Sequence, residues 1–330
     1  MKAAYITQLG PAESIVYGDL PRPEISASQV LVKINAVCVN PVDTYIRSGA
    51  IAMPLPFPFV IGCDLAGTVE AVGSSAKRFK VGDRVWGTNQ GLLGRQGTFA
   101  EFAAVDETFL YLTPANVPDE QAASVALVSI TAGLGLLRDA KLKAGETLFI
   151  NGGSGGVGSM VVQMAKAIGA KVVTTAGSEE KVKKCLQLGA DRAINYKTED
   201  VPAEVKKFAP DGVNVYWETL REPDFDKTVA MLAQRGRMIL MAGRDARPVF
   251  PVGPFYVKGC ALHGFVIFLS SPEDQRACVD QINPWLAEGK IKSCIDRVLP
   301  LSKAAEAHKL QEESTVGKLG ALTGKIVLKP

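Results

Sequence analysis

Histidine is scarce in this chain of 330 residues, which contains only His263 and His308. A Ser-His-Asp hydrolase or a histidine-rich metal site would have to use one of these two residues. His263 follows two apolar residues in an expected core strand, and His308 lies among helix-forming residues. We expect His263 to be packed in the core and His308 to lie at the surface, so metal catalysis is not expected.

Closely spaced cysteines are also missing. The six cysteines are scattered along the chain and none forms a C-x-x-C pair. This spacing excludes the usual zinc cluster and a redox dithiol. We expect reduced thiols that are mostly buried.

Long runs of basic residues and long runs of apolar residues are absent as well. The net charge is +3, and the densest basic run, at 181–184, is interpreted as a solvated helix face. Nucleic acid is therefore not an expected partner. No apolar run reaches the roughly 18 residues of a membrane span, and the N-terminus lacks the apolar region of a signal peptide. We expect a soluble, cytoplasmic protein.

The most informative stretch that is present reads TLFINGGSGGVG, at 147–158. A short apolar strand leads into Gly153, Gly155 and Gly158, in the spacing G-x-G-x-x-G, and residues 156–168 follow with a helical apolar period. In a dinucleotide-binding unit these glycines allow a tight turn, close approach of a pyrophosphate, and packing of helix on strand. The pyrophosphate would lie against the N–H groups at the start of the helix.

The rest of the chain indicates an α/β protein of two domains. The first 120 residues are β-rich, with strands expected at 1–7, 29–39 and 64–73 and a hairpin-like pair at 84–87 and 97–105. Strands and helices then alternate from 147 to 243, which predicts a doubly wound parallel sheet. Because this segment is flanked by other sequence, we expect a domain inserted into another, with the active site in the cleft.

The residues after the second expected strand bear on which nucleotide binds. An enzyme that uses NAD carries an acidic residue there for the ribose 2′-hydroxyl. Here the strand 171–176 is followed by Gly177, Ser178 and Lys181. A hydroxyl and an ammonium suit a 2′-phosphate, so we expect NADPH. Ser178 is equally suited to cap a helix, and two acidic residues, Glu179 and Glu180, lie close by and oppose a phosphate.

Several segments resemble the medium-chain dehydrogenase/reductases, and more narrowly the zinc-free quinone oxidoreductases that include zeta-crystallin. They are N-P-V-x-T-Y-I-R-S-G at 40–49, IGCDLAGTVEAVG at 61–73, VGDRVWG at 81–87, the glycine turn, and TGKIVL at 323–328. The resemblance implies a β-rich, GroES-like catalytic domain formed by residues 1–122 and 266–330. It further implies an inserted Rossmann domain, at 123–265, that binds NADPH.

The same resemblance implies that zinc is not used. Zinc-containing relatives place a cysteine where this chain has Asn40, and a G-H-E segment where it has Gly62, Cys63 and Asp64. The four-cysteine structural zinc loop has no counterpart. A single thiol does not make a zinc site.

By this resemblance, catalysis falls to Asn40 and Tyr45, which would face the nicotinamide. Tyr45 would supply a hydroxyl donor and Asn40 an amide donor to a substrate oxygen. The residues expected to contact the cofactor are Asn40, Tyr45, Thr131, Ser154, Gly155, Gly156, Val157, Gly177, Ser178, Lys181, Tyr196, Ala242, Gly243, Arg244, Phe265, Val266 and Ile267.

One departure from the relatives concerns protonation. Enoyl-thioester reductases commonly carry a tyrosine where this chain has Ile51, which cannot donate a proton. We therefore expect hydride transfer to a quinone or similar electrophile, whose reduced product takes its proton from water. The apolar segment 53–59 beside it suggests a hydrophobic substrate wall or a proline-stiffened loop.

Two other functions remain open. One is NADPH-dependent reduction of the C=C bond of an alkenal, enone or enoyl thioester. The other is a structural or RNA-binding role for a crystallin-like NADPH-binding protein, against which the lack of a basic stripe argues. Relatives form homodimers through the cofactor domain, and the strand-like segment 260–268 is a candidate for that contact.

Overall fold

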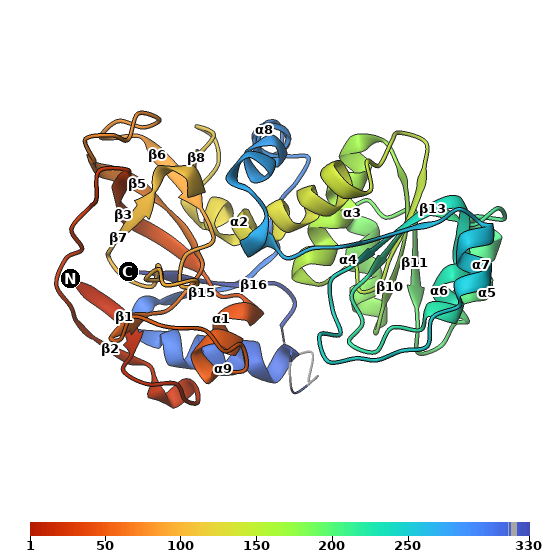
Figure 1. Ribbon diagram of the computed structural model, residues 1–330, viewed down its shortest axis with the longest axis horizontal. Helices are drawn as coiled ribbons and strands as arrows, with labels where there is room; N and C mark the ends of the chain where they lie inside the picture. Colours follow the sequence, from red (N-terminus) through yellow and green to blue (C-terminus); the bar gives the residue numbers. More distant parts are fainter. Residues whose placement is uncertain (316, 318–321) are drawn as a thin grey trace. The chain divides into compact units, whose positions relative to one another are not determined.

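The computed structural model describes residues 1–315, 317 and 322–330. Within this described part, the chain divides into two compact units (Figure 1). Unit 1 comprises Met1–Leu127 and Lys292–Pro330, and unit 2 is the continuous segment Val128–Ile291. The expected insertion of one domain into the other is therefore confirmed. The domain ends expected after residues 122 and 265 stay a prediction. The contacts within the chain place the two divisions after Leu127 and after Ile291.

Unit 1 is β-rich, as its alternating apolar pattern predicts. Its larger sheet has the order β15-β16-β3-β5-β6-β8, with β7 paired to β3, and its smaller sheet has the order β2-β1-β4. The strands are β1 (Lys2–Ile6), β2 (Val16–Asp19), β3 (Gln29–Cys38), β4 (Phe59–Val60), β5 (Asp64–Val72), β6 (Arg84–Gly87), β7 (Phe102–Asp106), β8 (Leu110–Leu112), β15 (Ile295–Pro300) and β16 (Lys325–Lys329). Short helical segments connect them: η1 (Ala12–Ser14), α1 (Pro41–Ser48), η2 (Glu107–Phe109), η5 (Leu301–Lys303) and α9 (Ala304–Thr315).

The register of unit 1 brings three strand ends together beside α1. Cys38, the last residue of β3, pairs with Asp64, the first residue of β5. Cys38 also pairs with Val327 of β16. The chain leaves β3 and enters α1 at Pro41, so the N-terminus of α1 lies at this junction.

The hairpin-like pair expected at 84–87 and 97–105 is wrong. Strand β6 pairs with β5 and β8, whereas β7 pairs with β3. The intervening segment contains Asn89, Leu93 and two glycines with positive φ, which turn the chain several times rather than once. A simple hairpin needs one tight turn, so the two segments cannot be direct neighbours.

Unit 2 contains the predicted parallel sheet, with the order β11-β10-β9-β12-β13-β14. The order reverses between β9 and β12, which is the place where dinucleotide folds bind their ligand. The strands are β9 (Thr147–Ile150), β10 (Lys171–Ala176), β11 (Arg192–Asn195), β12 (Val213–Glu218), β13 (Leu232–Leu240) and β14 (Ala261–Gly264).

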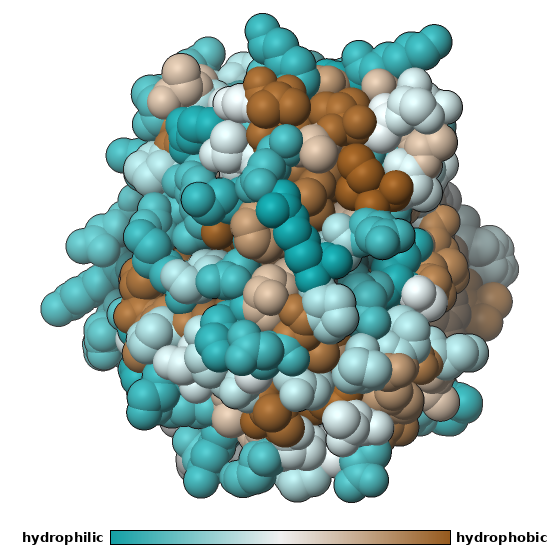
Figure 2. Space-filling view, turned by 90° about the vertical axis from the view of Figure 1, so that its left-hand side faces the viewer, coloured by the Kyte–Doolittle hydropathy of each residue, from teal (hydrophilic) through white to brown (hydrophobic). Residues whose placement is uncertain are grey.

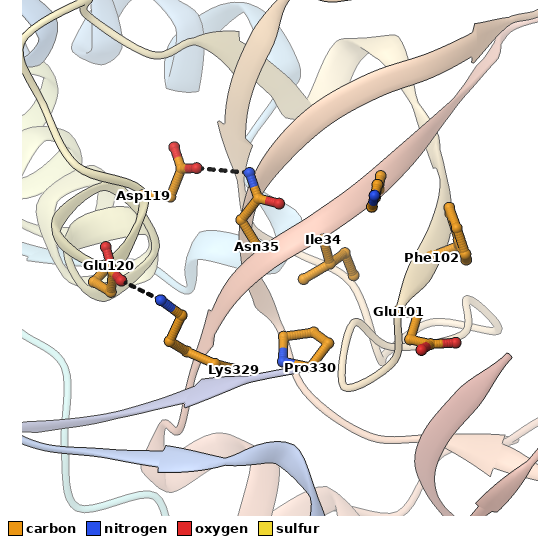
Figure 3. A pocket seen from close by; sticks show the side chains of 9 residues that line it. Ile34, Asn35, Glu101, Phe102, Asp119, Glu120, Lys329 and Pro330 are labelled. Carbon is orange, nitrogen blue, oxygen red and sulfur yellow. Dashed lines mark hydrogen bonds and ion pairs between the residues drawn. The ribbon is translucent and has the colours of Figure 1, made fainter.

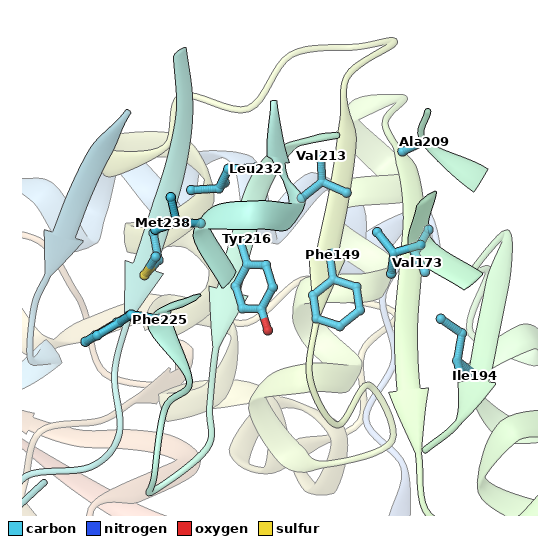
Figure 4. Close-up of a cluster of buried hydrophobic side chains, with 11 residues drawn as sticks. Phe149, Val173, Ile194, Ala209, Val213, Tyr216, Phe225, Leu232 and Met238 are labelled. Carbon is cyan, nitrogen blue, oxygen red and sulfur yellow. The ribbon is translucent and has the colours of Figure 1, made fainter. Parts of the chain in front are cut away.

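Helices cover both faces of this sheet. They are α3 (Gly156–Ile168), α4 (Glu179–Gln187), α5 (Val201–Phe208), α6 (Phe225–Met231) and α7 (Val252–Val257). The remaining helical segments of unit 2 are η4 (Ile267–Leu269) and α8 (Pro272–Ala287), and α8 packs against the segment Leu134–Asp139. On one face, Phe149, Val173 and Tyr216 pack with Val205 of α5 and Val229 of α6 (Figure 4). Right-handed crossovers require α3 and α4 to lie on the opposite face, because β9, β10 and β11 advance in the other direction.

Helix α2 (Asp119–Gly133) continues into the π-helical segment η3 (Leu134–Asp139), and the division between the units falls within α2. The helix Asp119–Asp139 is long and apolar enough to cross a membrane, but 78% of its most apolar window is buried inside the protein. Such burial is typical of a core helix.

Both expectations for histidine are wrong. His263 lies on β14, at the edge of the sheet, and is only half-buried. His308 is completely buried on α9, with its ring 5.8 Å from that of Phe99 in an edge-on contact. Burial, followed by the nearby Arg47 guanidinium, lowers the pKa of His308 to about 3. The free cysteines agree with the prediction, since most of those described are buried.

Candidate active site

The glycine turn of unit 2 connects β9 to α3 and is shaped by close backbone packing. Gly152 has a left-handed φ of 69°. A Cβ on Gly158 would lie 2.2 Å from the Gly152 carbonyl oxygen, and one on Gly153 would lie 2.3 Å from Thr174 Oγ1. A Cβ on Gly155 would meet only the Gly152 carbonyl oxygen, at 3.3 Å. The turn therefore packs tightly against the sheet at Gly153 and Gly158 and is more open at Gly155.

The predicted pyrophosphate-binding residues Ser154, Gly155, Gly156 and Val157 all lie in this turn and in the first turn of α3. The first backbone N–H groups of any helix have no acceptor within the helix and point along its axis. They also carry the positive end of the helix dipole. This arrangement suits a phosphate group.

Polar side chains that were not predicted from the sequence hold the turn in place through hydrogen bonds. Thr175 Oγ1 accepts a hydrogen bond from the Gly152 amide at 3.0 Å, and Thr219 Oγ1 donates to the Asn151 carbonyl at 3.0 Å. Asn151 Nδ2 donates to Glu218 Oε1 at 3.1 Å and contacts the Tyr216 hydroxyl at 3.0 Å. Burial raises the pKa of the Glu218 carboxyl, although the Leu220 amide opposes the shift. These residues end β9, β10 and β12, so they cluster at the reversal of strand order.

The residues predicted to hold the adenosine ribose lie together after β10 and β11. A Cβ on Gly177 would be 2.4 Å from the Tyr196 hydroxyl, so these two residues are in contact. Ser178 caps α4 and accepts from the Lys181 amide at 3.3 Å, which is the capping role considered for it. Glu179, one of the two acids that opposed a phosphate, accepts instead from Asn195 Nδ2 at 2.7 Å.

Most of the other predicted cofactor residues of unit 2 also lie beyond the carboxyl ends of its parallel strands. Ala242, Gly243 and Arg244 follow β13, and Gly243 has a left-handed φ of 74°. Phe265, Val266 and Ile267 follow β14, where the Phe265 ring meets Trp217 edge-on. Thr131 is buried on α2. Apart from Thr131, the predicted residues of unit 2 thus lie beyond the carboxyl ends of parallel strands.

In unit 1, Asn40 is the N-cap of α1 and its carboxamide is held from both sides. Its Oδ1 accepts from Lys325 Nζ at 2.5 Å, and its Nδ2 donates to Asp64 Oδ2 at 2.8 Å. Its backbone amide donates to Asp43 Oδ2 at 2.7 Å, which completes a capping box. Asn40 and Asp64 are completely buried. The polar atoms of the Asn40 side chain are therefore bonded within unit 1.

Buried acids and a thiol surround this amide. Burial raises the pKa of the Asp43 carboxyl to about 7 and that of Asp64 to about 6, while the Lys325 ammonium lowers both. Burial, followed by the adjacent Asp43 carboxyl, raises the pKa of the Cys63 thiol well above its usual value. Cys63 is therefore a protonated thiol rather than a thiolate. Among residues 1–315, 317 and 322–330, no group of three or more His, Cys, Asp and Glu side chains is placed to hold a metal ion.

Tyr45 lies farther along α1 and is half-buried. The Tyr45 carbonyl accepts from the amide of Ile51 at 3.1 Å, so the end of α1 and the start of the apolar segment 53–59 are connected. Gln96 Nε2 donates to the carbonyls of Pro56 and Pro58, at 3.0 and 2.9 Å. These bonds favour the interpretation of this segment as a fixed loop.

A hollow of about 650 Å³ lies elsewhere in unit 1 (Figure 3). Its charged side chains are compensated, since Asn35 donates to Asp119 at 2.7 Å and Lys329 to Glu120 at 2.8 Å. None of the predicted site residues lines it. The side of the molecule shown in Figure 2 has hydrophilic side chains around separate hydrophobic areas.

A β-rich unit interrupted by a parallel sheet, with a glycine turn at the reversal of strand order, defines a class of enzymes: the medium-chain dehydrogenase/reductases. Two domain families match the chain accordingly. The alcohol dehydrogenase GroES-like domain matches residues 26–115, and the zinc-binding dehydrogenase domain matches residues 156–283.

Individual relatives show to which family within this class the chain belongs. The quinone oxidoreductase of Sus scrofa is 35% identical over 97% of this chain and 94% of its own length. The NADPH-dependent alkenal/one oxidoreductase of Arabidopsis thaliana is 34% identical over 93% of this chain and 74% of its own length. A crystal structure of Escherichia coli quinone oxidoreductase with NADPH has a TM-score of 0.85 and 26% identity, with both chains fully covered. The chain belongs to the quinone oxidoreductase family of the medium-chain dehydrogenase/reductases.

Proposed function

We propose that this protein is a zinc-independent, NADPH-dependent oxidoreductase of the cytoplasm that reduces quinones or similar electrophiles. The observation that carries the proposal is the arrangement after β10. Ser178 and Lys181 follow the strand with no carboxylate at its end, and Glu179 is bonded to Asn195. This environment favours a 2′-phosphate over a free 2′-hydroxyl.

The residues of unit 2 would bind and orient the cofactor. The turn residues Ser154, Gly156 and Val157 are proposed to offer backbone N–H groups to the pyrophosphate, with Thr175 and Thr219 holding the turn in place. The Gly155 amide donates to the Gly152 carbonyl at 3.1 Å, so Gly155 is proposed to contribute by letting the pyrophosphate approach the backbone. The ribose phosphate is assigned to Gly177, Ser178, Lys181 and Tyr196. The nicotinamide side is assigned to Thr131, Ala242, Gly243, Arg244, Phe265, Val266 and Ile267. When bound, NADPH supplies the hydride.

In unit 1, Tyr45 is the proposed hydrogen-bond donor to the substrate oxygen. Positioning alone can lower a barrier by about 7–11 kcal/mol, so the reaction needs no strong acid beside the substrate. The hydroquinone anion formed by hydride transfer takes its one proton from water, consistent with the apolar Ile51. Asn40 is proposed to act through its position at the start of α1, because both polar atoms of its carboxamide are already bonded, to Lys325 and to Asp64.

The zinc independence rests on the chemistry of the residues in the ligand positions. Asn40 is an amide, which is not among the usual ligands of zinc, and it is bonded to an ammonium. Zinc binds thiolate, imidazole or carboxylate ligands, and a nearby ammonium repels it. Activity is expected to persist after prolonged treatment with a strong chelator. An inactive chelated enzyme that regains activity with added zinc would disprove this part of the proposal.

The test of cofactor choice is the double variant Ser178→Ala, Lys181→Ala. The Michaelis constant for NADPH should rise about tenfold or more, while that for NADH changes little, because the 2′-phosphate is the only part of the cofactor assigned to these two side chains. Lys183→Ala is the matched control, since Lys183 is exposed on the same helix. Equal changes for both cofactors would contradict the assignment.

The Arabidopsis relative favours one alternative, reduction of an activated C=C bond. That reaction needs a proton delivered to carbon, and Ile51 lies where relatives carry the donor. NADPH oxidation measured with ortho- and para-quinones, enones and enoyl thioesters separates the two functions. Faster turnover of enones than of every quinone would favour the alternative.

We also propose a homodimer formed through the cofactor-binding unit. Large apolar side chains are exposed around α7 and the edge strand β14, namely Val249, Val252, Tyr256, Val257 and Leu262. An exposed apolar group beside an unpaired strand edge is typical of a protein contact. Tyr256→Glu with Val257→Lys should give monomers in analytical ultracentrifugation, whereas Val81→Glu in unit 1 should not. A dimer that survives the double change would exclude this surface.

A further inference from the structure

A buried ionic network anchors the start of α1 to the sheet of unit 1 (α1 and β16 are labelled in Figure 1). Lys325 is the first residue of β16, Asp64 is the first residue of β5, and Asn40 caps α1. Lys325 Nζ donates to Asn40 Oδ1 at 2.5 Å and to the Val39 carbonyl at 3.1 Å. These groups are separated by up to 286 residues in the chain.

We propose that Lys325 is a positioning residue for the reaction: by holding the Asn40 carboxamide in one orientation, it fixes α1 and therefore the place of the Tyr45 hydroxyl. The inference rests on the proposed role of Tyr45. It assigns to Lys325 an effect on turnover, exerted through Asn40 and α1 and not by contact with substrate.

The hydrogen bonds allow only one orientation of the amide. Its oxygen faces an ammonium, which can only donate, and its nitrogen faces a carboxylate, which can only accept when ionised. A flipped amide would set oxygen against Asp64 and nitrogen against Lys325. The backbone of Asn40 is bonded to the first turn of α1, since its carbonyl accepts from the Asp43 amide at 3.1 Å and its amide donates to Asp43 Oδ2 at 2.7 Å. A residue held through its side chain therefore gives the helix a fixed starting point.

The helix that carries Tyr45 is short, so the position of its first residues determines the direction of the whole helix. It spans eight residues, Pro41–Ser48, and Tyr45 lies five residues after the cap. At about 1.5 Å of rise per residue, Tyr45 is about 7.5 Å along the axis from Asn40. A tilt at the cap therefore moves the hydroxyl, and a displacement of about 1 Å can lower a rate about 100-fold.

The charges around Lys325 support the assignment. Lys325 is 7% exposed, and Asp43 Oδ1 and Asp64 Oδ1 are buried without hydrogen-bond partners. The ammonium also lowers the pKa values of the Asp43, Asp64 and Cys38 side chains against the effect of burial. Lys325 is thus the cation of a buried acidic cluster, and its removal would leave Asn40 Oδ1 without its donor, so that Asp64 alone would hold the amide.

The experiment compares Lys325→Met with Lys325→Gln, in which the amide nitrogen can still donate to Asn40. Lys329→Met is the matched control, because Lys329 lies on the same strand but is exposed in an ion pair with Glu120. We expect Lys325→Met to lower kcat about 10- to 100-fold with the Michaelis constant for NADPH changed less than about twofold. Lys325→Gln should recover part of the loss, and Lys329→Met should behave as wild type.

A double variant tests whether the effect acts through Tyr45. In a Tyr45→Phe background, Lys325→Met should lower kcat by less than about twofold, because the hydroxyl it positions is already gone. A full multiplicative loss in that background, or an equal rise in the NADPH Michaelis constant, would overturn the proposal.

The last measurement does not depend on which substrate the enzyme uses. Hydrogen–deuterium exchange of a peptide covering Pro41–Ser48 should be faster in Lys325→Met, but not in Lys329→Met, and this can be measured on folded protein without turnover. Unchanged exchange would overturn the anchoring itself. Faster exchange in an enzyme that reduces no quinone would keep the anchoring and reject the proposed function. If Lys325→Met does not fold, the Lys325→Gln variant carries the same comparisons.

Discussion

The glycine turn of unit 2 and the N-terminus of α1 in unit 1 both place the start of a helix at strand ends, but they are built differently. The turn uses backbone: Gly153 and Gly158 leave no room for a Cβ, and the first amides of α3 have no acceptor within the helix. The α1 junction uses buried side chains, with an ammonium and two carboxyls around one carboxamide. The first design offers groups to a ligand, whereas the second satisfies its own groups internally. The comparison suggests that unit 2 binds and unit 1 positions.

The largest expected effect comes from breaking the charged junction with Asp64→Ala. The change removes the acceptor of Asn40 Nδ2 and leaves the Lys325 ammonium buried with less negative charge around it. Removing one partner of a buried ionic group costs about 3–5 kcal/mol. Urea unfolding should show this loss. Asp19→Ala, in an exposed pair with Lys2, should leave the transition in place. Equal shifts of the urea unfolding transition in both variants would show that burial does not increase the contribution of this charged group to stability.

The backbone design is tested by Gly158→Ala. The added Cβ would lie 2.2 Å from the Gly152 carbonyl oxygen, so the turn must open. We expect NADPH affinity to fall about 100-fold, equivalent to about 2.8 kcal/mol. Gly253→Ala is the control, since a Cβ there meets nothing within 4 Å. Calorimetric titration with NADPH gives both values, and an unchanged affinity in Gly158→Ala would mean that the turn does not bind the cofactor.

The effect of a buried neutral imidazole should appear in the pH dependence of stability through His308→Gln, and it is small at each step of one pH unit. The folded pKa of His308 is about 3, below the unfolded value of about 6.5. The unfolded chain therefore binds the proton first, and the stability present above about pH 6.5 is lost as the pH falls toward 3. The wild type should lose about 1.4 kcal/mol more per pH unit than the variant in that range. Parallel curves from urea unfolding would contradict the buried, neutral imidazole.

The smallest effect concerns the support beneath the turn. Thr175→Val removes the acceptor of the Gly152 amide with little change in volume. A hydrogen bond of this kind contributes about 1 kcal/mol, so NADPH affinity should fall about fivefold. An affinity lowered as far as in Gly158→Ala would show that the side chains, and not the glycines, determine the shape of the turn.

The same contrast explains what the sequence could predict. The helix expected at 156–168 and the strand at 171–176 have the observed bounds, because strand, turn and helix signals there are local. The fold of both units follows from such signals and from the resemblance. The expected cofactor residues of unit 2 lie at one edge of the sheet for the same reason, although their contact with NADPH stays a prediction.

The junction in unit 1 could not be predicted in this way. Lys325 and Asn40 meet only after the sheet has formed, and nothing in TGKIVL marks its lysine as a buried cation. For His308 a usable signal existed. The buried residues Ala304, Ala307, His308 and Gln311 have helical spacing, which places the histidine on the inner face of α9. The reverse error at His263 arose because an edge strand with exposed apolar residues has the same apolar pattern as a core strand.

The position of β16 has a consequence for how the protein is made. Unit 2 is one continuous segment that ends at Ile291, so its strands are all available while the chain is still being synthesised. Unit 1 starts before unit 2 and is completed after it, because its second segment, which contains Lys325, follows Ile291 in the chain. Domains fold as their residues emerge from the ribosome. The cation that secures α1 therefore reaches its partners only after the whole of unit 2 has been synthesised, and a chain that stopped before β16 would have a cofactor-binding unit without a completed partner.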